Sequence, residues 1–186
     1  MTAGLDPAGV ALVVCAAPLA ERSHDLAGHL VAAGYSVTVT PTPAAGEWVD
    51  GAAIETATSR AAKLTGRRPG EPRTTPKPAN VVVAPLTFNT LNLWAIGASN
   101  NRALGVLNDA LGTGAGVVAV PIFADRLWAH PALSGHVDML RAAGVTFLDV
   151  RDGREGSPHL ASGAAPQLAQ DFDPAWLLPY LTSPRP

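Results

Sequence analysis

The sequence predicts a single α/β domain in which helices cover both faces of a doubly wound parallel sheet, giving three layers. Short apolar runs of strand length alternate with segments of helical periodicity along most of the chain. The connections between these runs are long enough to carry a crossover helix, which parallel neighbouring strands require. A length of 186 residues is the usual size of one domain.

The first part of the chain has a β-α-β pattern. Residues 10–15 (VALVVC) form a continuous apolar run, which is typical of a strand buried on both faces. Residues 20–33 carry apolar side chains at helical spacing, and Gly34 follows as a helix terminator. Residues 35–40 (YSVTVT) are rich in β-branched side chains and predict a second strand. The alanine-rich residues 43–64 predict a further helix.

The second part repeats this alternation after an exposed connection at residues 65–78, which is rich in proline and glycine. Further strands are expected at residues 80–84, 117–120 and 145–150, and further helices at residues 91–111 and 131–143. Glycine, proline, serine and alanine predominate after Arg151, so residues 151–186 are expected to be an irregular extension with a short helix near its end. Residues 1–8 are expected to be disordered, which leaves residues 9–150 as the domain.

Composition excludes several classes of function. The net charge is −2, so there is no basic excess to neutralise nucleic-acid phosphates. A single cysteine, Cys15, excludes disulfides within the chain and zinc sites with several cysteines. The apolar residues 10–17 are too few to span a bilayer and follow no basic segment, so we expect a cytoplasmic protein with no membrane partner. The five histidines lack HExxH spacing and predict no metal site.

Ligands of doubly wound sheets bind beyond the carboxyl ends of the strands. After the third expected strand, Thr87, Asn89 and Thr90 precede a helix, where short polar side chains and free amides suit a phosphate. Equally, Asn89 or Thr90 would simply cap that helix. After the fourth strand, Trp128 and His130 would either contact a flat ligand and titrate, or be packing and surface residues.

Two segments carry a resemblance to a known family. Residues 85–101 (PLTFNTLNLWAIGASNN) resemble P-x-S-A-N-T followed by G-x-x-D-N, and residues 121–131 (PIFADRLWAHP) resemble P-A-M-N-x-x-M-W followed by a proline. Both are signatures of the homo-oligomeric flavin-containing cysteine decarboxylases, which include phosphopantothenoylcysteine and lantibiotic peptide decarboxylases. The resemblance extends in order over residues 10–150.

The resemblance implies a Rossmann-like, flavodoxin-like subunit that binds FMN, or FAD, and forms homo-trimers that can assemble into dodecamers. Its implied flavin-binding residues are Ala17, Thr42, Thr87, Asn89 and Thr90. Its implied substrate-binding residues are Asn100, Ala124 and Trp128, and its implied catalytic positions are Glu71, where the family has a histidine, and Asn101.

The chain also departs from the family's pattern. Ala16, Ala17 and Pro18 replace residues of the first loop that would surround a phosphate, and proline lacks an amide donor. Ala124 replaces a substrate-binding asparagine, and the family's cysteine-containing flap is missing. We therefore expect an FMN-binding protein with an altered reaction, such as oxidative decarboxylation of a cysteine-containing small molecule or peptide, and not an efficient phosphopantothenoylcysteine decarboxylase. The alternatives are a non-catalytic subunit that acts through oligomerisation or a partner and, ranked last, a prenyl-flavin synthase relative.

Overall fold

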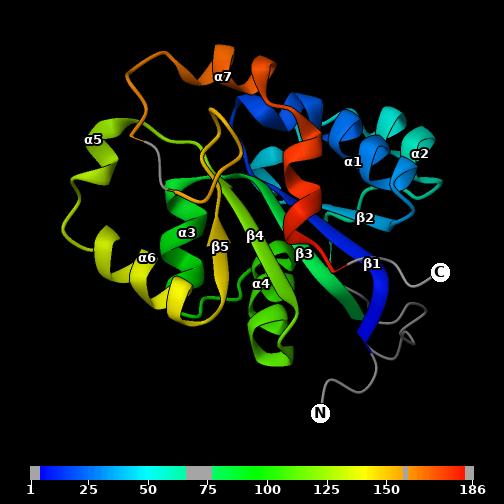
Figure 1. Cartoon of the computed structure of the whole chain (residues 1–186), viewed down its shortest axis with the longest axis horizontal. Coiled ribbons are helices and arrows are strands. Elements are labelled where there is room, and N and C mark those ends of the chain that lie inside the picture. The colour runs from blue at the N-terminus through cyan, green and yellow to red at the C-terminus, as the bar shows by residue number, and fades with distance from the viewer. Residues whose placement is uncertain (1–4, 66–76, 157–158, 183–186) are drawn as a thin grey trace.

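A computed structural model describes residues 5–65, 77–156 and 159–182 of the chain. Its centre is an all-parallel sheet of five strands in the order β2-β1-β3-β4-β5 (Figure 1). The strands are β1 Leu5–Val14, β2 Ser36–Pro41, β3 Lys77–Leu86, β4 Gly116–Pro121 and β5 Val145–Phe147. This order confirms the predicted doubly wound fold of the flavodoxin type, in which the chain changes direction between β1 and β3.

One face of the sheet is covered by the first two helices and by the C-terminal helices (Figure 1). These helices are α1 Ser23–Ala32, α2 Gly51–Thr58, α7 Ala165–Asp171 and the 3-10 helix η3 Pro174–Tyr180. Two short 3-10 helices, η1 Pro18–Arg22 and η2 Pro43–Ala45, follow β1 and β2. On this face β1 contributes Val10, Leu12 and Val14 to the core.

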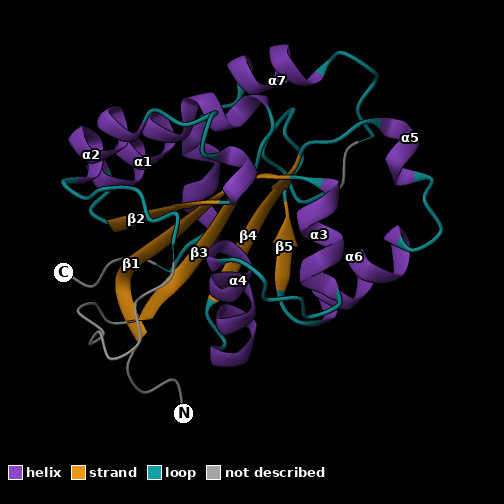
Figure 2. Cartoon of the chain, turned by 180° about the vertical axis from the view of Figure 1, so that it is seen from behind, coloured by secondary structure: helices purple, strands orange, loops and turns teal. Residues whose placement is uncertain are grey.

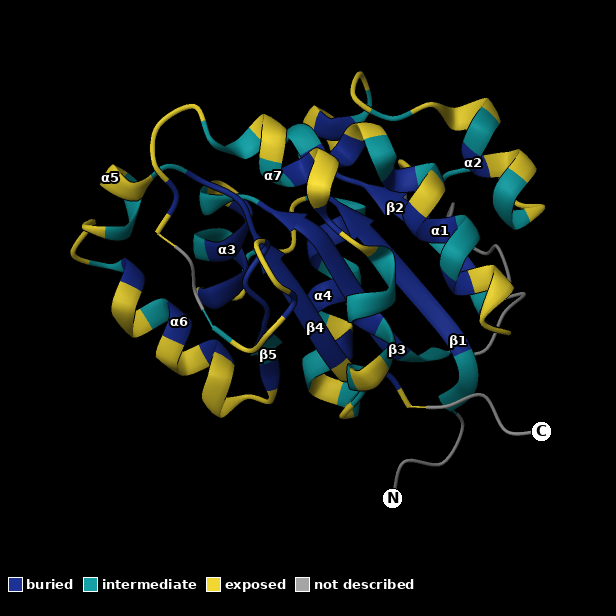
Figure 3. Cartoon of the chain, turned by 45° about the horizontal axis from the view of Figure 1, so that its top comes forward, coloured by how far each residue is buried: buried dark blue, intermediate teal, exposed yellow. Residues whose placement is uncertain are grey.

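The opposite face, which is turned to the viewer in Figure 2, is covered by α3 Phe88–Ala95, α4 Arg102–Thr113 and α6 Leu133–Ala142. Here β1 contributes the alternate residues Ala11, Val13 and Cys15. Because successive side chains of a strand point to opposite faces, a strand between two helical layers must be apolar throughout. Figure 3 shows this as a sheet that is buried along most of its length.

The prediction of a single helix at residues 91–111 is wrong, because two helices, α3 and α4, occupy this region. Helix α3 ends at Ala95, shortly before Gly97, whose φ of 74° is unfavourable for other residues and whose N–H donates to the Trp94 carbonyl (2.9 Å). Helix α4 starts after Asn101, whose Oδ1 accepts a hydrogen bond from the Leu104 N–H (3.0 Å). Both a stop signal and a start signal are therefore present inside the apolar periodicity.

The helix expected at residues 43–64 is also shorter than predicted. Asp50 caps α2, since its Oδ1 accepts hydrogen bonds from the N–H groups of Ala52 and Ala53 (3.0 Å each). The helix ends at Thr58 and is followed by Ser59, which has a left-handed conformation with φ of 56°. Alanine content alone predicted helix here, but a cap at Asp50 and a turn at Ser59 limit it to α2.

Both ends of the described chain are more ordered than expected. Residues 5–8 belong to β1, where Leu5 pairs with Lys77 of β3, although the sequence predicted disorder there. After residue 150, Phe172 and Leu177 are buried in the core of the α1 face. Arg22 ties this segment to η1, because its Nη1 donates to the carbonyls of Ala169, Gln170 and Phe172 at 2.8–2.9 Å. Much of the expected irregular extension is thus part of the folded core.

Within the described ranges, every helix is too short or too polar to cross a bilayer.

Candidate functional site

The loops that follow the central strands are joined by backbone hydrogen bonds at the carboxyl edge of the sheet. The Cys15 N–H donates to the Pro85 carbonyl (3.1 Å) across the switch point between β1 and β3. The Thr42 N–H donates to the Val14 carbonyl (2.8 Å). The loops after β1, β2 and β3 therefore lie together, where ligands of this fold class bind.

Thr42 lies at this edge, at the start of η2. The residue is only 6% exposed, and its hydroxyl has no hydrogen-bond partner within the described part of the chain. Thr42 Oγ1 is not one of the fully buried, unpartnered side-chain atoms of the described residues, so this oxygen is open to solvent. Thr42 is therefore available to a bound ligand without the loss of any protein contact.

Thr87 and Thr90 come together in the first turn of α3. Their hydroxyl oxygens are 3.2 Å apart, and Thr87 Oγ1 accepts the Thr90 N–H at 3.5 Å, so Thr87 caps the helix. Asn89, which was expected to act with them, is exposed, whereas Thr90 is buried. The cap is therefore Thr87, and not Asn89 or Thr90 as predicted. Two hydroxyls lie at this helix N-terminus, where the helix dipole favours a negative charge.

The loop that follows β1 offers few free hydrogen-bond donors to a ligand. The Ala17 N–H donates to the Cys15 carbonyl (3.0 Å), and the Ala17 carbonyl accepts the Ala20 N–H (2.8 Å). Pro18 follows and has no N–H. Ala17 is buried at the expected place, but its amide already has a partner within the protein.

Cys15 ends β1 as a buried free thiol. Burial raises the pKa of this thiol, and hydrogen bonds with Thr90 and Thr87 oppose that rise only in part. A neutral, buried thiol is a poor nucleophile. Cys15 is therefore a packing residue beneath the two threonines.

We expect Cys15 to resist alkylation by iodoacetamide at pH 8 in the folded protein and to react readily in concentrated urea. Because its pKa is raised on folding, the thiol's contribution to stability is complete below the unfolded-state pKa, about 8.5, and is lost as the pH rises towards the folded-state value. Mass spectrometry of the alkylated chain measures both reactions. Rapid labelling of the folded protein would contradict this prediction.

Asn100 and Asn101 lie in the connection between α3 and α4. Asn101 caps α4, and its Nδ2 donates to Asn100 Oδ1 (3.3 Å). Asn100 is exposed and Asn101 is half-buried. The structure thus gives Asn101 a helix-capping role, besides the catalytic role that the resemblance implies.

The β4 loop and α5 (Asp125–Trp128) carry a cluster of aromatic rings. Trp128 stacks on Phe123, with ring centroids 4.6 Å apart, and on His159, at 5.2 Å. Phe88, the first residue of α3, meets Phe123 edge to face at 5.8 Å. Trp128 therefore lies inside an aromatic stack that starts at the α3 loop.

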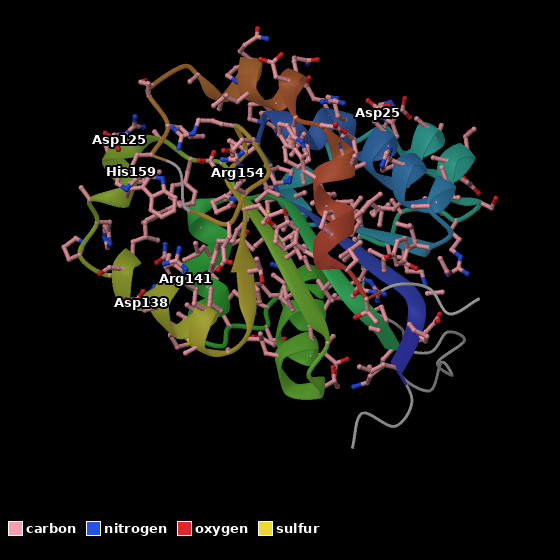
Figure 4. The ribbon with its side chains drawn as sticks, in the orientation of Figure 1. Asp25, Asp125, Asp138, Arg141, Arg154 and His159 are labelled. Carbon is pink, nitrogen blue, oxygen red and sulfur yellow. The ribbon has the colours of Figure 1, made fainter. Side chains whose placement is uncertain are left out.

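Asp125 and His159 form a pair that sequence reasoning missed. His159 Nδ1 is 2.7 Å from Asp125 Oδ1, although the two residues are 34 positions apart. Figure 4 shows them next to each other beside α5. Ala124, expected to bind substrate, forms a parallel bridge with Leu160 and so joins the two segments. No spacing or motif in the sequence signals this pairing.

Of the remaining predicted positions, Glu71 lies outside the described residues. A shallow open groove lies elsewhere, between α1 and α2. Its lining residues are His24, Asp25, Gly28, His29, Ala32, Ala53, Thr56, Ala57 and Pro174. This groove contains none of the predicted site residues. The candidate site lies instead at the carboxyl edge of the sheet, where the hydroxyls of Thr42, Thr87 and Thr90 lie.

Comparison with solved structures shows the same fold in three proteins. The FMN-binding protein AtHal3 is 18% identical with a TM-score of 0.68, and the match covers 89% of this chain and 94% of that one. The FMN-dependent cysteine decarboxylase SpaF is 19% identical with a TM-score of 0.63, covering 87% and 95%. A cysteine-to-serine mutant of PPC decarboxylase, complexed with pantothenoylaminoethenethiol, is 18% identical with a TM-score of 0.63, covering 75% and 80%.

No curated protein sequence shows significant similarity to this chain. The sequence model of the family described as Flavoprotein matches residues 6–170, which is most of the chain and includes the five strands except Leu5, each of the site loops and the Asp125–His159 pair. The chain therefore belongs to the Flavoprotein family.

Proposed function

We propose that the chain binds FMN at the carboxyl edge of the sheet and carries out a decarboxylase-like reaction on a cysteine-containing small molecule or peptide. Membership of the Flavoprotein family supports a flavin site. AtHal3 is an FMN-binding protein and SpaF an FMN-dependent cysteine decarboxylase, and both share this fold. At such low identities the fold is what is shared, so FMN and the reaction are our proposal for this chain.

The observation that carries the proposal is the hydroxyl of the buried Thr42, which has no partner in the described part of the chain. A phosphate or ribityl oxygen would accept its hydrogen bond in place of water. The Thr87 and Thr90 hydroxyls, 3.2 Å apart at the start of α3, add polar groups on the neighbouring strand end. These residues fit a phosphorylated ligand that carries hydroxyl groups.

A bound flavin would supply the electron acceptor that oxidation of a thiol requires. Thr42 would hold the phosphate or ribityl chain, and Thr87 and Thr90 would lie along the cofactor. Phe88 and Phe123 would form an apolar wall that excludes water from one side of the site. Since Ala17 and Pro18 leave few donors in the β1 loop, we expect FMN to be held mainly by the β2 and β3 loops.

We also propose that the chain forms homo-trimers. Ile96 is 67% exposed in the connection between α3 and α4, next to the expected substrate-side asparagines. The low share of charged residues, 15%, supports an interface between copies, because a surface buried in an oligomer needs no solubilising charges. Light scattering should give about three times the chain mass of 19.0 kDa, and a monomeric mass would contradict the trimer.

The function is tested by removing the Thr42 hydroxyl. Thr42→Val should weaken FMN binding at least about tenfold, because a hydrogen bond to a charged group contributes about 1.5–3 kcal/mol. Its matched control is Thr40→Val in β2, since Thr40 is also buried and its hydroxyl has no partner within the described ranges. Fluorescence quenching of added FMN measures both affinities.

We expect Thr40→Val to bind FMN like the wild type. Equal affinities for the two variants would remove Thr42 from the flavin site. A colourless wild-type protein that takes up no added FMN would overturn the proposal and favour the non-catalytic subunit instead.

A further inference from the structure

A histidine lies in the turn between α5 and α6, two helices on the same side of the molecule as α3 (Figure 2). The backbone of His130 is fixed, because its N–H donates to the Leu127 carbonyl (3.2 Å) and its carbonyl accepts the Leu133 N–H (2.9 Å). Its Nδ1 accepts the Ala132 N–H (3.2 Å), so the ring is neutral and carries its proton on Nε2. The free position of this ring is therefore a hydrogen-bond donor and not a base.

The ring of His130 lies against the start of α3. It meets the ring of Phe88 edge to face, with centroids 5.5 Å apart and an interplanar angle of 71°. Phe88 directly follows Thr87, whose hydroxyl belongs to the proposed flavin site. The imidazole thus contacts the first residue of α3 without an intervening side chain, next to the loop that is proposed to hold FMN.

The Nε2–H of His130 is available to a ligand. His130 is exposed, and its Nε2 has no hydrogen-bond partner among the residues that the structure describes. Two other cationic or imidazole side chains that follow β5 are already paired with carboxylates. Arg151 Nε lies 3.0 Å from both carboxylate oxygens of Asp149, and His159 Nδ1 lies 2.7 Å from Asp125 Oδ1. Within the described ranges, His130 is the exposed imidazole that contacts Phe88.

We propose that His130 binds the carboxylate of the substrate through its Nε2–H, and so selects ligands with a free carboxylate beside the cysteine thiol. The assignment rests on the function proposed above, since a substrate that is decarboxylated must carry a carboxylate. The apolar wall of Phe88 and Phe123 offers that charge no hydrogen bond, and a charge placed against an apolar surface is costly without one. The Nε2–H at the rim of this wall supplies a charge-assisted hydrogen bond.

The test compares two ligands that differ only in this carboxylate. The probes are acetylated dipeptides that end in serine, one as the free acid and one as the C-terminal amide. Serine has nearly the size of cysteine but no thiol that a flavin could oxidise. Titration into the full-length protein loaded with FMN, followed by flavin fluorescence, gives both affinities. The wild type should bind the free acid at least about tenfold more tightly than the amide, as expected for a hydrogen bond to a charged group.

The His130→Ala variant should bind both probes with the affinity that the wild type has for the amide. Because the side chain is exposed, the variant should unfold at the same temperature as the wild type, which thermal unfolding checks.

The matched control is His159→Ala. His159 is also an exposed imidazole of the aromatic cluster, but its ring contacts Trp128, with centroids 5.2 Å apart, at the end that lies away from Phe88. We expect this variant to keep the wild-type preference for the free acid.

A second measurement needs no flavin. Nitrogen NMR of the imidazoles should show His130 with its proton on Nε2, and a proton on Nδ1 instead would overturn the assignment. A wild type that binds no FMN overturns the proposed function and this assignment with it. If FMN binds, His130 alone is excluded by a wild type that does not prefer the free acid, or by a preference that persists in His130→Ala or is lost equally in His159→Ala.

Discussion

A Gly153→Ala substitution is expected to lower the free energy of unfolding by about 3 kcal/mol or more. Gly153 has a φ of 69°, and a Cβ atom added to it would lie 2.3 Å from Trp176 Cβ and 2.4 Å from Trp176 Cγ. These atoms sit close to the backbone of η3, so the helix itself would have to move. The Tyr180 hydroxyl also donates to the Gly153 carbonyl (3.3 Å), and that contact would be disturbed.

The Gly163→Ala variant separates the steric clash with Trp176 from the backbone cost of a left-handed conformation. Gly163 has a φ of 84°, but an added Cβ would meet no atom within 4 Å in the described structure. This control should therefore show only the backbone cost, about 1 kcal/mol. Urea unfolding gives both values, and similar losses for the two variants would mean that η3 does not dock tightly on the turn at Gly153.

A Trp94→Ala substitution is expected to lower the free energy of unfolding by about 3–5 kcal/mol. Trp94 is the largest fully buried side chain of the described residues and lies on α3 among the residues of the α3–α4 face of the core. Its removal leaves a cavity that the close-packed sheet cannot fill. Because α3 carries Thr87 and Thr90 at its start, FMN affinity should fall as well.

Trp94→Phe is the matched control. The Trp94 Nε1–H is buried and has no hydrogen-bond partner in the described part of the chain, so this change breaks no hydrogen bond. We expect a loss of about 1–2 kcal/mol, from reduced packing alone. Thermal and urea unfolding with and without FMN measure both effects, and a loss as large as that of Trp94→Ala would contradict this account of the site.

The fold could be predicted because it depends on short-range patterns. Each buried strand is an apolar run, since the parallel sheet has helices on both faces. The α1 terminator at Gly34, with a φ of 93°, was evident from its glycine. The boundaries at Gly97 and Asn101 were equally present in the sequence, but the apolar periodicity across them predicted one continuous helix. The capping residues Gly97 and Asn101 determine the helix boundaries, although the apolar periodicity continues across them.

The candidate site divides in the same way. The sequence by itself determined the doubly wound order of strands and helices and the loops with Thr42, Thr87 and Thr90, because strand ends and helix starts are local features. Only the tertiary structure decided that Thr42 is buried with a hydroxyl that lacks a partner in the described ranges, and that His159 lies beside Asp125 and Trp128. Burial and contacts between segments 34 residues apart depend on how helices and loops pack over the sheet, and no periodicity along the chain encodes that packing.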